Sequence, residues 1–283
     1  MGTSYPNRTN ARGIWKLSDI TKNKITQGTH PSSFGNRAIV AGGIEPGYVN
    51  KIETINILAT GNATDFGDLN AARKSCFGPS SRTRATFGGG YSSGTTETKN
   101  INYVHFATTG NAADFGDLSA NRTDGTSCAN TTRGLFMGGY TAPAAVNIIE
   151  FITQAALGNA TDFGDLTVAR WLGGGFESET RGIMGGGGGP IGNTIDFFEI
   201  STTGNAADFG DLSANRDNLS GCSSKTRGIF YNGGAPSATN IIESISIASK
   251  GNATDFGDST AARSHTSSTS NTQRGLGIGG NGL

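Results

Sequence analysis

Short segments of alternating apolar and polar residues recur along this chain in a fixed order. In the clearest of them Glu53, Ile55 and Ile57 share one face, and the same spacing recurs over residues 196–200 and 243–247. A period of two, with many β-branched residues, predicts a β-strand with one packed face. A second kind of segment begins at an Arg and runs through apolar residues into a glycine pair, as in residues 133–139. It too predicts a short strand.

These segments belong to an internal repeat. The string Gly-Asn-Ala-(Thr/Ala)-Asp-Phe-Gly-Asp occurs five times, at spacings of 49, 48, 46 and 47 residues, and begins at Gly61, Gly110, Gly158, Gly204 and Gly251. An Arg follows each copy, and a second Arg always lies 11 residues further on. Each unit predicts four strands: one after the first Arg, one after the second Arg, one Ile-rich strand, and one that carries Asp-Phe-Gly-Asp. Four strands in such a period predict a β-propeller blade.

Counting the strands indicates how the ring closes. The Arg-to-glycine strand occurs six times, and its first and last copies start at Arg37 and Arg274, which are 237 residues or five periods apart. We therefore predict an all-β fold over residues 36–283, a five-bladed β-propeller of four-stranded blades closed by pairing of N- and C-terminal strands. Two copies of the second strand then compete for one place. One of them must lie elsewhere.

Repeated charged and aromatic residues are predicted to hold the blades together. The acids of the third strand share the face of the apolar residues, which is costly unless each meets a cation, so the repeated Arg residues are the predicted partners. These acids are Glu53, Glu150, Asp196 and Glu243. The Phe of each Asp-Phe-Gly-Asp string is predicted to pack between blades. These are Phe66, Phe115, Phe163, Phe209 and Phe256.

Composition excludes several classes of protein. Gly makes up 45 of 283 residues, which disfavours helices, and 22 basic residues balance 22 acidic ones, which disfavours nucleic acid and anionic membranes as partners. No apolar run reaches the roughly 18 residues of a membrane helix, and Met1 to Arg12 lacks the apolar core of a signal peptide. We therefore expect no membrane insertion and no signal-dependent export. Three cysteines do not make a disulfide framework.

The sequence contains no clear catalytic or metal-binding pattern. The three histidines, His30, His105 and His265, occupy unrelated places in the repeat and offer no zinc or copper spacing. Asp65 and Asp68 are predicted to stabilise a turn, and the alternative is that such carboxylate pairs bind Ca²⁺. We accordingly expect no enzyme activity, no catalytic residue, no cofactor and no metal, with Ca²⁺ as the alternative.

Two resemblances bear on function. The glycine pair and the period resemble the kelch repeat, and a five-fold ring with such blades also resembles an invertebrate lectin. The segment Asn-Ala-Arg-Gly-Ile-Trp-Lys-Leu-Ser-Asp, residues 10–19, resembles a short motif of phage tail-fibre and other virion proteins. The longer string in residues 158–170 resembles repeats of structural proteins of marine phages. These likenesses imply a place on a virion rather than a reaction.

The hypotheses differ in setting. The first is a non-enzymatic phage virion protein, a fibre, appendage or decoration subunit, localised to the virion and contacting other virion proteins. A free lectin or protein-interaction propeller is the alternative, and a hydrolase or oxidase on the same scaffold is a third. Residues 1–35 lie outside the repeat, and there Ile14, Trp15 and Leu17 are interpreted either as an anchor to a partner or as a cap on the propeller.

Binding is predicted to occur in the variable loops. Residues 88–100, 138–147, 185–193 and 233–240 differ in length while the strands around them keep their register, so they are expected to cluster on one rim. Tyr91, Tyr140 and Tyr231 lie in or beside these loops, and aromatic faces suit the apolar face of a sugar. The hypothesis is that they bind host surface polysaccharide. The alternative is that they pack against neighbouring loops or another subunit.

Overall fold

The computed structural model describes residues 37–234, 236–271 and 274–281. All regular secondary structure in these ranges is antiparallel β-sheet, and they contain no helix that could span a membrane. The predicted N-terminal extension, residues 1–35, and its candidate anchor residues Ile14, Trp15 and Leu17 lie outside the described ranges. Their roles stay predictions.

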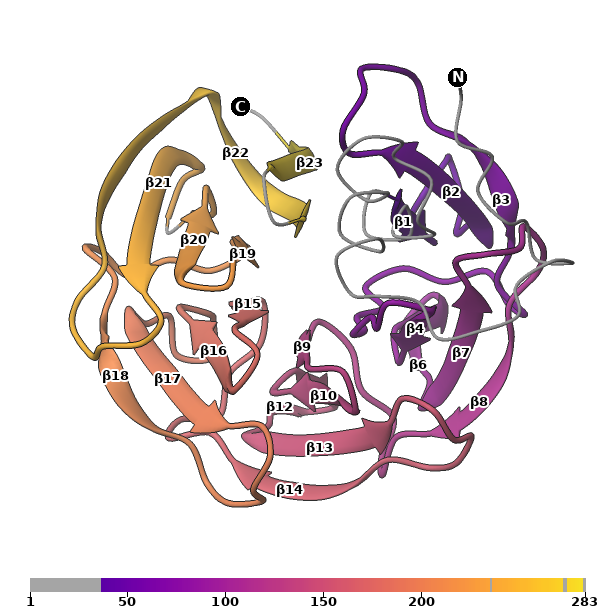
Figure 1. Cartoon of the computed structure of the whole chain (residues 1–283), viewed down its shortest axis with the longest axis horizontal. Helices are drawn as coiled ribbons and strands as arrows, with labels where there is room; N and C mark the ends of the chain where they lie inside the picture. Colours follow the sequence, from indigo (N-terminus) through magenta and orange to yellow (C-terminus); the bar gives the residue numbers. More distant parts are fainter. Residues whose placement is uncertain (1–36, 235, 272–273, 282–283) are drawn as a thin grey trace, which may run out of the picture. The chain divides into compact units, whose positions relative to one another are not determined.

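Five sheets surround a common centre as a five-bladed β-propeller with a nearly closed seam, which confirms the predicted fold (Figure 1). In the three blades with all four strands, the first strand of the repeat lies beside the centre and the fourth on the circumference (Figure 1). The first blade contains β1 (Arg37–Ala41), β2 (Lys51–Asn56) and β3 (Thr64–Asp68). The second contains β4 (Arg84–Gly88), β7 (Asn100–His105) and β8 (Ala113–Asp117), and isolated bridges from Phe77 and Ser80 to β4 stand in for its inner strand.

The other three blades have all four strands. The third contains β9 (Thr126–Ala129), β10 (Arg133–Met137), β13 (Ile148–Thr153) and β14 (Thr161–Asp165). The fourth contains β15 (Gly174–Glu177), β16 (Arg181–Gly185), β17 (Thr194–Glu199) and β18 (Ala207–Asp211). The fifth contains β19 (Ser220–Ser223), β20 (Arg227–Tyr231), β21 (Thr239–Ser246) and the first part of β22 (Thr254–Ser270). Two small hairpins lie outside the blades: β5 (Tyr91–Ser93) with β6 (Thr96–Glu97), and β11 (Tyr140–Thr141) with β12 (Ala144–Ala145).

At the seam the strand pairing differs from the expectation. The second part of β22 pairs with β23 (Gly275–Asn281), from Ser264 opposite Asn281 to Ser270 opposite Gly275. Among the described strands, β1 pairs only with β2. The surplus copy of the second strand is therefore β23. It pairs with β22, its neighbour in sequence, and takes the place that the prediction gave to β1 across the seam. A short hairpin costs less loop-closure entropy than a strand pair that joins the two ends of the ring.

The junction between blades explains the repeated glycine of Asp-Phe-Gly-Asp. Gly67 has a φ of 148°, and a Cβ placed there would lie 2.3 Å from the carbonyl oxygen of Gly110 in the next blade. The register of β2 and β3 also shifts at this level, between Ile52 and Glu53. Only a residue without a side chain permits this close approach of two backbones.

Apolar packing is shared between neighbouring blades. Phe66 of the first blade lies in one cluster with Ala85, Val104 and Phe106 of the second. Four of the five predicted Phe residues are 2% exposed, which confirms their packing role: Phe66, Phe115, Phe163 and Phe209. Each such burial contributes about 1.5–3 kcal/mol. Phe256 is the exception, because 53% of it is exposed and no complete blade follows it.

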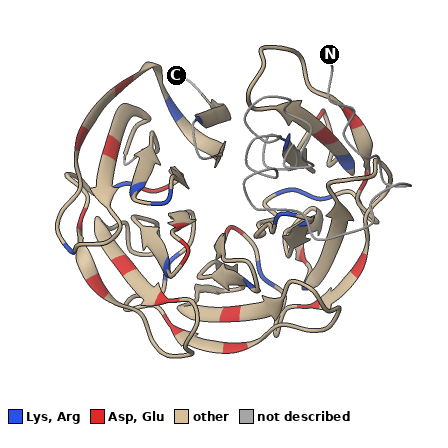
Figure 2. Cartoon of the chain, viewed as in Figure 1, with Lys and Arg blue, Asp and Glu red and all other residues tan. Residues whose placement is uncertain are grey.

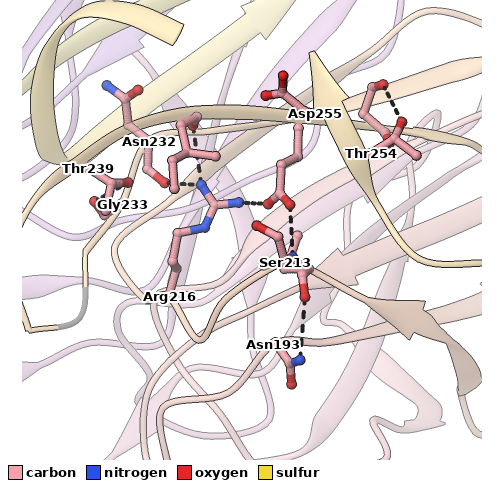
Figure 3. A network of polar contacts seen from close by, with 12 residues as sticks. Asn193, Ser213, Arg216, Asn232, Gly233, Thr239, Thr254 and Asp255 are labelled. Atoms are coloured by element: carbon pink, nitrogen blue, oxygen red, sulfur yellow. Dashed lines mark hydrogen bonds and ion pairs between the residues drawn. The ribbon is translucent and has the colours of Figure 1, made fainter. Parts of the chain in front are cut away.

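Buried ion pairs confirm part of the charge prediction. The first Arg of a unit reaches the acid of the next third strand in three cases: Arg122 with Glu150, Arg170 with Asp196, and Arg216 with Glu243. In Figure 3, Arg216 also donates to the carbonyl oxygens of Asn232 and Ile241, and Glu243 accepts a hydrogen bond from the backbone N–H of Ser213. In the second blade neutral Asn102 takes this place, facing Arg73.

In several units the second Arg has another partner, a carbonyl oxygen of the next blade. Arg133 does not meet an acid, because its Nη1 donates to the carbonyl oxygen of Ile200 in the next blade at 2.9 Å while its guanidinium lies over Phe151. The corresponding distances from Arg37, Arg84 and Arg181 to the next blade are 2.6, 3.0 and 3.0 Å. These Arg residues link blade to blade.

Candidate functional site

The glycine pairs at the end of each second strand lead into the variable loops of one rim. Tyr91 and Tyr140 each follow such a pair and form backbone bridges to Lys74 and Thr123, respectively. Their hairpins are joined, because the carboxylate of Glu97 accepts hydrogen bonds from the backbone N–H of Ala142 at 3.2 and 3.3 Å. The structure thus places two of the three predicted tyrosines in equivalent positions on adjoining hairpins.

Tyr91 contributes to a small polar and aromatic cluster. The Lys74 ammonium lies 5.4 Å from the ring centre of Tyr91 and 5.5 Å from that of Tyr48. The Tyr48 hydroxyl donates to the carbonyl oxygen of Gly94 at 2.6 Å, which ties the first two blades together on this rim. Beside this cluster is a shallow hollow of about 420 Å³, lined by Tyr48, Ala72, Ser92 and Gly94.

Tyr140 has an aromatic neighbour that the sequence analysis missed. Its ring centre lies 5.1 Å from that of Trp171, and the two planes are tilted by 35°. Trp171 directly follows the first Arg of its unit, as Lys74 and Thr123 do in theirs. Lys74 and Thr123 form backbone bridges to Tyr91 and Tyr140. Aligning the repeats would therefore have placed Trp171, at the same position, beside the rim. Both rings are partly exposed.

Tyr231 occupies a different place. It is the last residue of β20 and lies within the fifth blade, where a Cβ at Gly277 of β23 would come within 2.5 Å of its ring. The structure therefore does not bring Tyr231 together with the other two tyrosines. Its contact with β23 belongs to the seam.

The charged residues of the described ranges are spread over the blades (Figure 2), and burial shifts the pKa of several groups. Lys and Arg, like Asp and Glu, recur from blade to blade without gathering into one field (Figure 2). Burial raises the pKa of the Cys128 thiol, and it raises that of Cys222 to about 11, so both are held as neutral thiols. Burial raises the pKa of Glu177 to about 7, while a hydrogen bond from the Ala129 backbone opposes the shift.

No group of three or more His, Cys, Asp or Glu side chains suited to a metal ion occurs in the described ranges. Asp68 instead contributes its backbone N–H to the junction with the second blade, where Asn111 Oδ1 accepts it at 3.1 Å. Asp65 and Asp68 lie in β3 rather than in a turn, and the side chain that supplies this hydrogen bond is that of Asn111. Calcium binding at Asp65 and Asp68, and the absence of any cofactor, stay predictions.

The fold and this rim define the protein as a β-propeller with an aromatic-bearing loop face. Compared with known proteins, the chain matches no family model and none of the curated sequences. No family or curated match therefore supports the resemblance to kelch repeats or to phage virion proteins, which rests on the repeat and on residues 10–19.

Proposed function

We propose that this protein is a non-enzymatic structural subunit of a phage particle, a fibre, appendage or decoration protein, whose propeller rim binds polysaccharide of the host surface. The frame of the ring repeats in sequence and in contacts, whereas the rim loops differ from blade to blade. A rigid frame with variable loops is the usual arrangement of a binding protein. The virion setting is supported by the likeness of the repeat to structural proteins of marine phages.

The observation that carries the binding proposal is the pair of aromatic clusters on adjoining blades, Tyr48 with Tyr91 and Tyr140 with Trp171. Aromatic faces take the apolar face of a sugar ring, and the neighbouring backbone and hydroxyl groups supply hydrogen bonds to its edge. Two such clusters suit an extended polymer better than a single small ligand, because each contributes a separate contact along the chain.

A glycan array of bacterial surface polysaccharides tests this proposal. Tyr91→Ala and Trp171→Ala are each expected to weaken binding at least about tenfold, which corresponds to loss of one stacking contact of about 1.4 kcal/mol. Tyr231→Ala is the matched control, because Tyr231 packs in the seam and is expected to leave binding unchanged. Binding that survives both rim substitutions would remove these residues from the site, and binding to no glycan would refute the polysaccharide proposal.

Mass spectrometry of purified particles tests the setting. The chain is expected among the proteins of intact virions. Recovery only from cell extract would instead favour the alternative, a free lectin or protein-interaction propeller.

A further inference from the structure

Four junctions between successive blades use one set of contacts. The carbonyl oxygen of the Phe in each outer strand accepts the N–H of the glycine in the following Gly-Asn-Ala turn, at 2.8, 2.9, 2.8 and 2.9 Å. The N–H of the Asp two residues later donates to the Oδ1 of the Asn in that turn, at 3.1, 3.0, 3.0 and 3.1 Å. Each of these outer strands therefore binds the Gly-Asn-Ala turn of the next blade.

The fifth outer strand, residues 254–258, has the same residues, but no such turn among the described residues lies against it. Phe256 is 53% exposed, whereas its four equivalents are 2% exposed. Nothing lies within 4 Å of a Cβ built on Gly257, although the equivalent glycines face the next blade's backbone at 2.3–2.5 Å. The remaining turn of this sequence, Gly61-Asn62-Ala63, is exposed and makes no such contact with any described residue.

A buried ion pair is incomplete at the same seam. Glu53 is exposed and forms no ion pair with any described residue, whereas the acids at this position in the third, fourth and fifth blades are buried against Arg. The Arg that the repeat assigns to Glu53 is Arg263. Its Nη1 instead donates to the carbonyl oxygen of Gly279 in β23 at 3.3 Å. Glu53 and Arg263 carry opposite charges and lie on opposite sides of the seam.

Strand β23 lies at the seam between Arg263 and the first blade, and its contacts with both neighbouring blades are sparse. Arg274 reaches the carbonyl oxygen of Leu58 in the first blade at 3.4 Å, the longest contact of its series. A cavity of about 220 Å³, lined in part by Arg227, Phe256 and Gly275, separates the hairpin from the fifth blade. Meanwhile the inner edge of β1 has no partner among the described strands, because β1 pairs there only with β2.

We propose that the free face of the fifth blade is the docking site of this chain's own first blade, and that β23 is a strap that gives way when the ring closes. In the closed ring the Gly61–Ala63 turn binds Phe256 and Asp258, Arg263 pairs with Glu53, and β1 replaces β23 beside β22. A second copy does not fit this site. Each junction relates neighbouring blades by rotation about the common centre, so a copy placed by the same rotation would overlap the first blade.

Hydrogen exchange on the full-length chain tests the proposal, and the repeat supplies internal controls. In the closed ring, amides of residues 254–258 exchange about tenfold more slowly than in a ring with a free seam, at a rate close to that of residues 207–211. Amides of β23 then exchange faster than those of β20. The reverse, with β23 protected and residues 254–258 fast, would overturn the proposal.

A mutant cycle gives a second readout. Glu53→Gln and Arg263→Gln are each expected to lower the melting temperature by about 5 °C or more, and together by less than the sum. With Glu53 exposed as in this structure, each would change it by less than about 2 °C, which would count against closure. Light scattering must show a monomer during these measurements. If the protection and the coupling occur only in a dimer, the occupant is a second copy and the proposal is wrong.

Discussion

Replacing Glu150 by Gln tests whether the buried ion pairs stabilise the propeller. Arg122 and Glu150 are each 1% exposed, and Glu150 accepts hydrogen bonds from the Arg122 guanidinium and, at 2.9 Å, from the backbone N–H of Ser119. Burial lowers the pKa of Arg122, and the carboxylate of Glu150 opposes that shift. The carboxylate therefore compensates a cation that has lost its water.

The magnitude follows from these contacts. Gln keeps the volume of Glu but has a single acceptor oxygen, so one of the two donors loses its partner and faces the amide N–H₂ instead. Breaking a buried pair costs about 3–5 kcal/mol, and the remaining amide oxygen recovers about 1 kcal/mol of it. We expect Glu150→Gln to lower the free energy of unfolding by about 2–4 kcal/mol and the melting temperature by roughly 5–15 °C.

Calorimetry, supported by urea unfolding, measures the effect against a matched substitution. Glu199 pairs with Arg181 at 2.9 Å, but its side chain is 47% exposed, so Glu199→Gln is expected to cost less than about 1 kcal/mol. The double variant Arg122→Met with Glu150→Leu is expected to be more stable than either single variant, because neither charge is left buried alone. Equal melting temperatures for Glu150→Gln and Glu199→Gln would refute the reasoning.

Three further predictions concern other blades. Asn102→Asp supplies the acid that Arg73 lacks, so thermal unfolding is expected at a higher temperature; a lower one would mean that desolvation outweighs the attraction. Burial raises the pKa of Glu177 from 4.5 to about 7. The contribution of its protonated form to the free energy of unfolding is therefore fully present below pH 4.5 and is lost as the pH rises through 7. Urea titrations should show this slope in the wild type and a flatter one in Glu177→Gln. Gly228→Ala would place a Cβ 1.9 Å from the Phe176 ring and is expected to cost about 1–3 kcal/mol by urea unfolding, whereas Gly47→Ala, with open space around it, should cost far less.

Part of the rim was accessible from sequence and part was not. Tyr91 and Tyr140 follow their glycine pairs directly, and that shared offset was enough to place them in equivalent positions. Tyr231 lies two residues before its glycine pair, within β20, so it does not reach the rim position that follows the pair. The contact of Tyr140 with Trp171 joins two blades, and no local pattern encodes the distance between them.

The sequence by itself determined the repeating frame: the number of blades, the order of strands within each, and the glycine and Phe positions at the junctions. Local period and turn chemistry suffice for these features, because every blade meets the same neighbours. Only the tertiary structure decided that the first Arg meets the buried acid in three blades while the second Arg reaches across to a carbonyl oxygen of the next blade, as Arg122 and Arg133 show. It alone decided the seam, where β1 and β23 have the same pattern and compete for β22. Two strands with equal local preferences are distinguished only by the packing and chain entropy of the whole ring.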